Sequence, residues 1–202
     1  MVKKLIYGVG VNDSLYQVVI NQTISGKQKR LWICPFYQTW TSMLLRCYNE
    51  KKRWYYRTYS DCIAVDEWHK FSCFRAWMEK QDWQGKQLDK DILLNGNRIY
   101  GPESCVFIPA RLNLFLVDRR LDRGEWPLGV SFSRSNSNFR AQCCNPFTGK
   151  NEHLGYFFSP EQAHEAWRAK KHEHALRYAD MQADSRIAQA LRERYITGGN
   201  YD

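Results

Sequence analysis

The sequence predicts an α+β protein with an N-terminal unit of hairpins and helices and a C-terminal three-stranded antiparallel sheet packed on a helix. Three observations predict this fold. Short alternating apolar stretches between glycine- and asparagine-rich turns indicate strands, two stripes of aromatic residues have helical spacing, and a charged stretch without periodicity separates the two regions. With 202 residues, 44% of them hydrophobic, the chain has material for two small cores.

The N-terminal third predicts a hairpin followed by two helices. Residues 1–33 are expected to form a β-hairpin or arm, because the stretch from Tyr16 to Ile20 is short and apolar and glycines interrupt the chain before it. A helix is expected from Pro35, a residue that suits the first helical turn. The two stripes with helical spacing contain Tyr37, Trp40, Met43, Leu44 and Cys47 in the first, and Trp68, Phe71, Phe74, Trp77 and Met78 in the second.

A ββα order is predicted over residues 87–116. Residues 88–93 alternate like a strand, Asn95-Gly96-Asn97 supplies a turn to Ile99-Tyr100, residues 105–108 form a second strand and a short helix follows Pro109. We place the domain boundary after this motif, so that residues 34–117 form one domain and residues 118–126 the linker.

The last part of the chain predicts a sheet followed by a helix. Three short strands with two intervening turns are expected before residue 158. Ser159 is then placed as an N-cap, with Pro160 at the first helical position and Gln162 three residues after the cap. This defines a domain over residues 127–180, and residues 181–202 are expected to form a C-terminal helix and tail.

The charge favours a polyanionic partner such as double-stranded DNA. The net charge is +9, and between Lys27 and Arg57 eight basic residues stand against one acid, Glu50. Within this stretch Lys51, Lys52 and Arg53 are expected to contact phosphate. The alternative is a basic surface around an aromatic core.

The start of the chain has a basic flank but no signal-peptide pattern, and no apolar run is long enough to span a bilayer. We therefore expect a cytoplasmic protein without a membrane partner, whose seven cysteines stay reduced. These cysteines are then buried hydrophobes, metal ligands or a mixture of the two.

The C-terminal domain resembles the Apetala2-type DNA-binding domain found in plant transcription factors and in phage and bacterial mobile endonucleases. The matching residues are Gly129-Val130, Phe139-Arg140-Ala141, His153-Leu154-Gly155-Tyr156-Phe157, Ser159-Pro160-Glu161-Gln162-Ala163 and Ala166-Trp167. The resemblance implies that one sheet face enters the major groove while the helix packs on the other. The side chains that would then contact DNA are Arg134, Arg140, Gln142, Lys150 and His153.

Residues 34–116 resemble a phage family described as HNH-endonuclease-like. The matching residues include Cys34-Pro35, Arg46-Cys47-Tyr48-Asn49, Asp66-Glu67-Trp68, Leu88-Asp89-Lys90-Asp91 and Pro102-Glu103-Ser104-Cys105. The resemblance implies a zinc-stabilised domain, with a structural Zn²⁺ held by Cys34, Cys47, Cys62 and Cys105. Cys73 competes with Cys62 for this role, and buried thiols without metal are the alternative.

The same resemblance implies a catalytic site in the ββα segment. Asp89, Asp91 and Asn113 could bind Mg²⁺ or Mn²⁺ through oxygen. Lys90 stands where the family has its general-base histidine, so it would have to lose its proton to act as a base, or would instead pair with phosphate. The alternative for Asp89 and Asp91 is a solvated or salt-bridged strand face.

Three functions follow, in decreasing order of expectation. The first is a metal-dependent DNA endonuclease or nickase of the mobile, homing type in the cytoplasm of an infected host cell. The second is a catalytically silent DNA-binding protein that regulates or protects DNA. The third is a phage accessory protein that binds a host protein, because tryptophan and tyrosine are enriched at interfaces.

Overall fold

The computed structural model describes residues 5–52, 54–59, 61–117 and 124–196, which form an α+β protein. The chain divides into two compact units, unit 1 (Met1–Pro109) and unit 2 (Ala110–Asp202). The division falls before the stretch of residues 118–126, of which 118–123 lie outside the described residues. Over the described residues, none of the helices combines the length and apolarity that crossing a bilayer requires.

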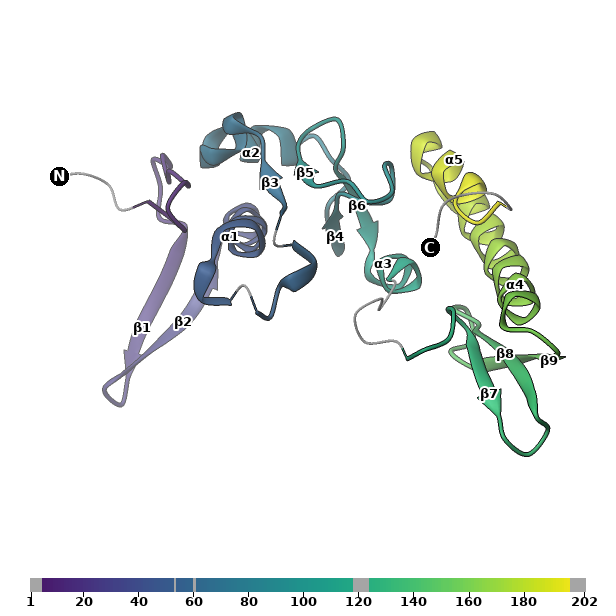
Figure 1. Cartoon of the computed structure of the whole chain (residues 1–202). Coiled ribbons are helices and arrows are strands. Elements are labelled where there is room, and N and C mark those ends of the chain that lie inside the picture. Colours follow the sequence, from purple (N-terminus) through teal and green to yellow (C-terminus); the bar gives the residue numbers. More distant parts are fainter. Residues whose placement is uncertain (1–4, 53, 60, 118–123, 197–202) are drawn as a thin grey trace. The chain divides into compact units, whose positions relative to one another are not determined.

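Unit 1 carries two α-helices and three two-stranded sheets (Figure 1). Strands β1 and β2 form an antiparallel hairpin, β3 pairs with β5 in parallel, and β4 pairs with β6 in antiparallel register. The elements are β1 (Val19–Ile24), β2 (Lys27–Ile33), α1 (Pro35–Tyr48), η1 (Glu50–Lys52), η2 (Arg57–Tyr59), β3 (Ile63–Ala64), η3 (Asp66–His69), α2 (Phe71–Met78), β4 (Lys86–Asp89), β5 (Ile99–Tyr100) and β6 (Val106–Pro109).

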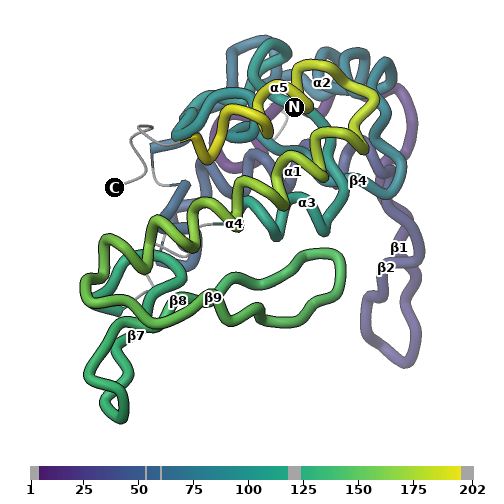
Figure 2. Tube along the Cα trace, turned by 90° about the vertical axis from the view of Figure 1, so that its right-hand side faces the viewer, coloured from purple at the N-terminus to yellow at the C-terminus, as the bar shows by residue number. Residues whose placement is uncertain are grey.

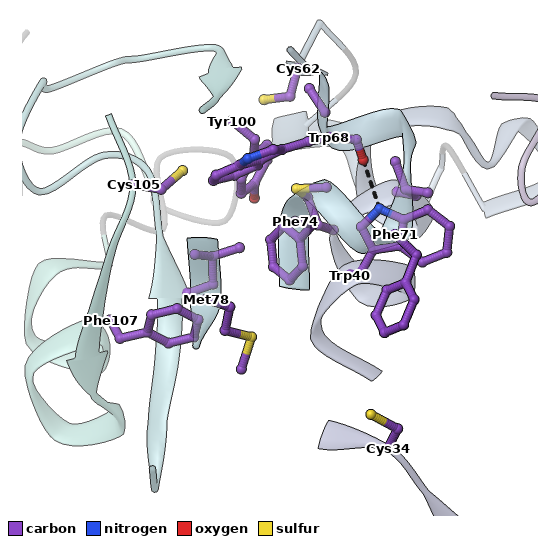
Figure 3. Packing of buried hydrophobic residues seen from close by; sticks show 14 of the residues in the cluster. Cys34, Trp40, Cys62, Trp68, Phe71, Phe74, Met78, Tyr100, Cys105 and Phe107 are labelled. Carbon is purple, nitrogen blue, oxygen red and sulfur yellow. Dashed lines mark hydrogen bonds between the residues drawn. The ribbon is translucent and has the colours of Figure 1, made fainter. Parts of the chain in front are cut away.

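The core of unit 1 contains residues of both aromatic stripes, which come from α1, η3 and α2, together with residues such as Tyr100 and Phe107 (Figure 3). Trp40 is fully buried, and its indole Nε1 donates to the carbonyl oxygen of Trp68 at 2.7 Å. Trp68 in turn meets Phe74 edge-to-face, with ring centroids 5.0 Å apart. The helix predicted from Pro35 is confirmed, whereas the stripe from Trp68 to Met78 is divided between η3 and α2.

The ββα segment differs in detail from its prediction. Strand β4 ends at Asp89, and its partner is β6, with Asp89 opposite Val106. Ile99-Tyr100, which follows the predicted turn, pairs in parallel with Ile63-Ala64. Strand β4 ends at Asp89 for a local reason. The Asp89 carboxylate accepts hydrogen bonds from the backbone N–H groups of Asp91 and Ile92, and this turns the chain out of the strand.

Unit 2 is a three-stranded antiparallel sheet with a long helix, α4, packed on one face (Figure 2). The predicted sheet, helix and Ser159 N-cap are confirmed, and the Ser159 Oγ accepts from the backbone N–H of Gln162 at 3.2 Å. The elements are α3 (Ala110–Leu116), β7 (Val130–Ser133), β8 (Asn138–Cys144), β9 (Asn151–Phe157), α4 (Pro160–Asp180) and α5 (Ser185–Glu193).

The short helix α3 belongs to unit 2 because it packs on α4 there. The Phe115 ring lies 5.1 Å from that of Tyr178, and the Lys171 ammonium donates to the Phe115 carbonyl at 2.7 Å while lying 3.8 Å from the same ring. Burial among these groups lowers the pKa of Lys171 to about 8. The helix of the predicted ββα segment is thus anchored in a different unit from its strands.

Candidate nucleic-acid interface

The two faces of the sheet in unit 2 have different characters. Helix α4 lies over the face that carries Ala141 and Cys143, both of which are buried. The opposite face, which we call the open face, carries Ser131, Arg140, Gln142, His153 and Tyr156. Cross-strand pairing places Ser131 beside Arg140, Arg140 beside Tyr156, and Gln142 beside His153. The open face is therefore a contiguous polar surface with a guanidinium, an amide and an imidazole in adjacent positions.

Contacts between neighbouring side chains position the residues of the open face. The Arg140 Nε donates to the Ser131 hydroxyl oxygen at 3.4 Å, which directs the guanidinium along the sheet. His153 packs against Tyr156, with ring centroids 4.9 Å apart. Two further cations flank the strands, since Arg134 follows β7 in an exposed turn and Lys150 precedes β9 in another. The five residues predicted to contact DNA thus lie on the open face or at its ends.

The charge on the sheet is divided between its faces. Across the three strands, all of which the structure describes, Glu152 is the one carboxylate, and it points to the helix side. There it accepts a hydrogen bond from the Asn145 amide at 2.8 Å and lies 3.5 Å from the Lys170 ammonium and 3.4 Å from His174 Nε2. The Asn145 hydrogen bond, together with the nearby Lys170 and His174, lowers the pKa of Glu152. The open face is consequently without acidic residues.

A bulge in β9 brings Tyr156 to the open face. Gly155 pairs with Ala141, but Gln142 pairs with His153, so Leu154 is an extra residue in β9. Gly155 has φ +128°, which side chains rarely adopt. Because of the bulge, His153 and Tyr156 share a face although they are three residues apart. Strict alternation misses Tyr156, and the glycine is the one signal in the sequence that could have indicated it.

The second predicted group of DNA contacts lies in unit 1. Lys51 and Lys52 are exposed on η1, whereas Arg53 lies outside the described residues. The aromatic residues that follow, Trp54 and Tyr55, are 75% and 66% exposed. The cations here are accessible to phosphate.

The four predicted zinc ligands do not assemble into one site. Cys34 stands apart from Cys62 and Cys105 (Figure 3) and instead contacts the Tyr16 hydroxyl, with an S···O distance of 3.6 Å. Cys47, Cys62 and Cys105 are close enough to influence one another electrostatically, and burial raises the pKa of Cys47 and of Cys105 to about 12. In the described part of the chain, no group of three or more potential ligands is arranged to hold a metal ion.

The predicted catalytic residues have structural partners. The Lys90 ammonium is buried and donates to the Asp91 carboxylate at 2.6 Å and to the Asn97 carbonyl oxygen at 2.5 Å. Asp89 holds the backbone of the same loop. Asn113 lies on α3 in unit 2, whereas Asp89, Lys90 and Asp91 lie in unit 1.

Lys90 shares its aromatic surroundings with a second cation. Its ammonium lies 5.7 Å from the centre of the Tyr59 ring and 5.9 Å from that of Tyr100. The Arg46 guanidinium lies 5.4 and 5.3 Å from the same two rings. Cation–π attraction and the hydrogen bonds of Lys90 together fasten α1, η2 and the 90–98 loop to one another.

Comparisons with known proteins do not assign the chain to a family. No protein-family model, curated protein or solved structure matches the chain.

We expect Lys90→Met to lower the free energy of unfolding of the chain by about 1–3 kcal/mol, because it removes the buried hydrogen bonds that Lys90 donates to the Asn97 carbonyl and the Asp91 carboxylate. Lys86→Met is the matched control, since Lys86 forms a more exposed ion pair with Asp82, and it should cost at most about 1 kcal/mol. Urea unfolding followed by circular dichroism measures both. Equal stability of the two variants would contradict the structural role of Lys90.

We expect two of the seven thiols to react rapidly with an aromatic disulfide reagent in the native protein at pH 8. These are the exposed Cys73 and Cys144, whereas Cys34, Cys62, Cys105 and Cys143 are buried and the raised pKa of Cys47 keeps it protonated. All seven should react after denaturation. Elemental analysis of the same sample measures bound zinc. One zinc ion per chain, released when the five slowly reacting thiols are modified, would contradict the described arrangement of Cys34.

Proposed function

We propose that the chain binds duplex DNA and that the open face of unit 2 reads base edges in the major groove. The observation that carries the proposal is the segregation of charge on the sheet. Arg140 and Gln142 lie on the face opposite α4, and the one strand carboxylate, Glu152, faces the helix. A surface of this kind attracts phosphate and has no carboxylate to repel it.

The open face has the groups that base recognition requires. Arginine pairs with the O6 and N7 atoms of guanine and glutamine with the N6 and N7 atoms of adenine, and each bidentate pair is worth about 1–3 kcal/mol of discrimination. The contact between Arg140 and Ser131 limits the directions that the guanidinium can take. Arg134 and Lys150, at the ends of the strands, would bind phosphates and set the register of the protein on DNA. In unit 1, Lys51 and Lys52 would add contacts that do not depend on sequence.

DNA cleavage of the HNH type is a separate part of the proposal, and the resemblance of residues 34–116 is its main support. Asp89 and Asp91 are the oxygen ligands that Mg²⁺ or Mn²⁺ would use. The Asp89 carboxylate is oriented by two backbone N–H groups, and Asp91 is paired with Lys90. Because both carboxylates and Lys90 also hold the loop, binding is proposed ahead of hydrolysis, and a zinc-stabilised domain is not needed for either.

Arg140→Ala combined with Gln142→Ala is expected to reduce sequence discrimination by about 2–6 kcal/mol in total, at little cost in stability, because both side chains lie on the open face. Selection of bound duplexes from a random pool, followed by titration of the best and the scrambled duplex, measures this. Arg192→Ala on α5 is the control, since Arg192 is an exposed cation paired with Asp180. A double variant that selects the same duplexes as the wild type would refute base reading by this face.

Cleavage is tested with supercoiled plasmid and phage DNA in the presence of Mg²⁺ or Mn²⁺. If the chain is a nuclease, Asp91→Asn is expected to lower the nicking rate at least a hundredfold while DNA binding is retained, because the metal loses a charged ligand. Asp82→Asn, which removes an exposed carboxylate of unit 1, is the control. Salt-sensitive binding by a wild-type protein that does not cut DNA would discard hydrolysis and keep the binding function.

A further inference from the structure

Strands β1 and β2 form a ribbon, residues 19–33, that extends from unit 1 to a free turn (Figures 1 and 2). Side chains are exposed along almost the full length of both strands. The ribbon is joined to the unit at its base, where Val18 is buried and its carbonyl oxygen accepts from the Cys34 N–H at 2.9 Å. Beyond this base the ribbon presents both of its faces to its surroundings.

The ribbon has a well-defined shape. Its two-residue turn contains Ser25 and Gly26, with φ angles of 51° and 75°, the positive values that a tight hairpin with matching twist requires. A bulge between Ile20 and Asn21 fixes the register nearer the base. A two-stranded hairpin without a core is marginally stable by itself, so a partner that binds the ribbon would stabilise it.

The positive charge of the ribbon suits a polyanionic partner. The ribbon carries Lys27, Lys29 and Arg30, and the sequence has no acidic residue between Asp13 and Glu50. Pairing places Lys27 opposite Ile24 and Lys29 opposite Gln22, while Arg30 lies opposite Asn21. Cations therefore lie on both strand faces, next to amide side chains that can bond to base edges.

Exposed apolar side chains accompany these cations. Ile20, Ile24, Leu31 and Trp32 are 40%, 45%, 55% and 43% exposed. Trp32 pairs with Ile20 across the strands. Apolar groups beside cations suit the inside of a DNA groove, where they meet sugars and thymine methyl groups while the cations reach phosphates on either side.

We propose that the β1–β2 ribbon is a second DNA-binding element that inserts into a groove of duplex DNA. A two-stranded ribbon fits within the major groove, and the three cations of this one would bind flanking phosphates. The inference shares its ligand class with the proposed function. The ribbon lies in the other unit, and its cations would supply a share of the salt-dependent affinity in addition to the phosphate contacts proposed above.

The test compares two full-length double variants that each remove two exposed lysines of unit 1. Lys27→Gln with Lys29→Gln alters the ribbon, and Lys70→Gln with Lys80→Gln is the matched control. Each phosphate contact contributes about 0.9 to the slope of log K against log salt, so the ribbon variant should have a slope smaller by about 2. Between 50 and 200 mM salt the wild type should then lose roughly tenfold more affinity than the ribbon variant. In hydroxyl-radical footprinting, DNA bound by the ribbon variant should lack one group of sugars that the wild type protects.

The outcomes separate this inference from the proposed function. A ribbon variant with the slope and footprint of the wild type, or a control variant with an equal loss, would overturn the inference. A dimer in the absence of DNA that only the ribbon variant abolishes would also overturn it, by assigning the ribbon to self-association. If Arg140→Ala with Gln142→Ala keeps the wild-type sequence preference while the ribbon variant loses its slope, the ribbon inference stands and base reading by the open face fails. Binding of no DNA at low salt would remove both.

Discussion

The arrangement of unit 2 depends on the close approach of Trp167 to Gly129. A Cβ at position 129 would lie 2.0 Å from the Cδ1 of Trp167, and the backbone φ there is +76°, so glycine is the residue that permits the contact. The contact holds α4 against the start of β7. On the same side of the sheet, Lys170 and His174 of α4 lie beside Glu152. The position of this helix therefore decides both which face of the sheet is covered and where its one carboxylate is neutralised.

The fold of unit 2 could be predicted from the sequence because its signals are local. Alternation gives the strands, turn residues separate them, and Ser159, Pro160 and Gln162 mark the start of α4. The position of Tyr156 could not be predicted in this way, because a bulge changes the face of every residue on one side of it. The register of a bulge depends on the neighbouring strand, which periodicity within one strand does not report.

Unit 1 was predicted less completely because its important contacts join residues that are distant in sequence. An alternating stretch with a lysine indicates a surface strand, yet Lys90 is buried through contacts with Asn97, Tyr59 and Tyr100. The cysteines show the same difficulty. Their spacing does not reveal that Cys34 meets Tyr16 while Cys47, Cys62 and Cys105 gather elsewhere. The resemblance implied one metal site for all four cysteines, whereas among the described residues Cys34 lies apart from Cys62 and Cys105.

The open face carries one arginine and the ribbon three cations, and this difference in charge is an argument for their joint use if both surfaces bind DNA as proposed. The open face has Arg140 and Gln142 for base edges, but its neighbouring serines contribute little charge. The ribbon has three cations on a short exposed hairpin, together with the amide side chains of Asn21, Gln22 and Gln28. When two weak surfaces belong to one chain, binding by one raises the effective concentration of the other, and the combined affinity can exceed either alone by roughly 10²–10⁴. In the proposed function, base discrimination would come from the open face of unit 2, and the ribbon of unit 1 would add salt-sensitive retention on DNA without a large contact area in either unit.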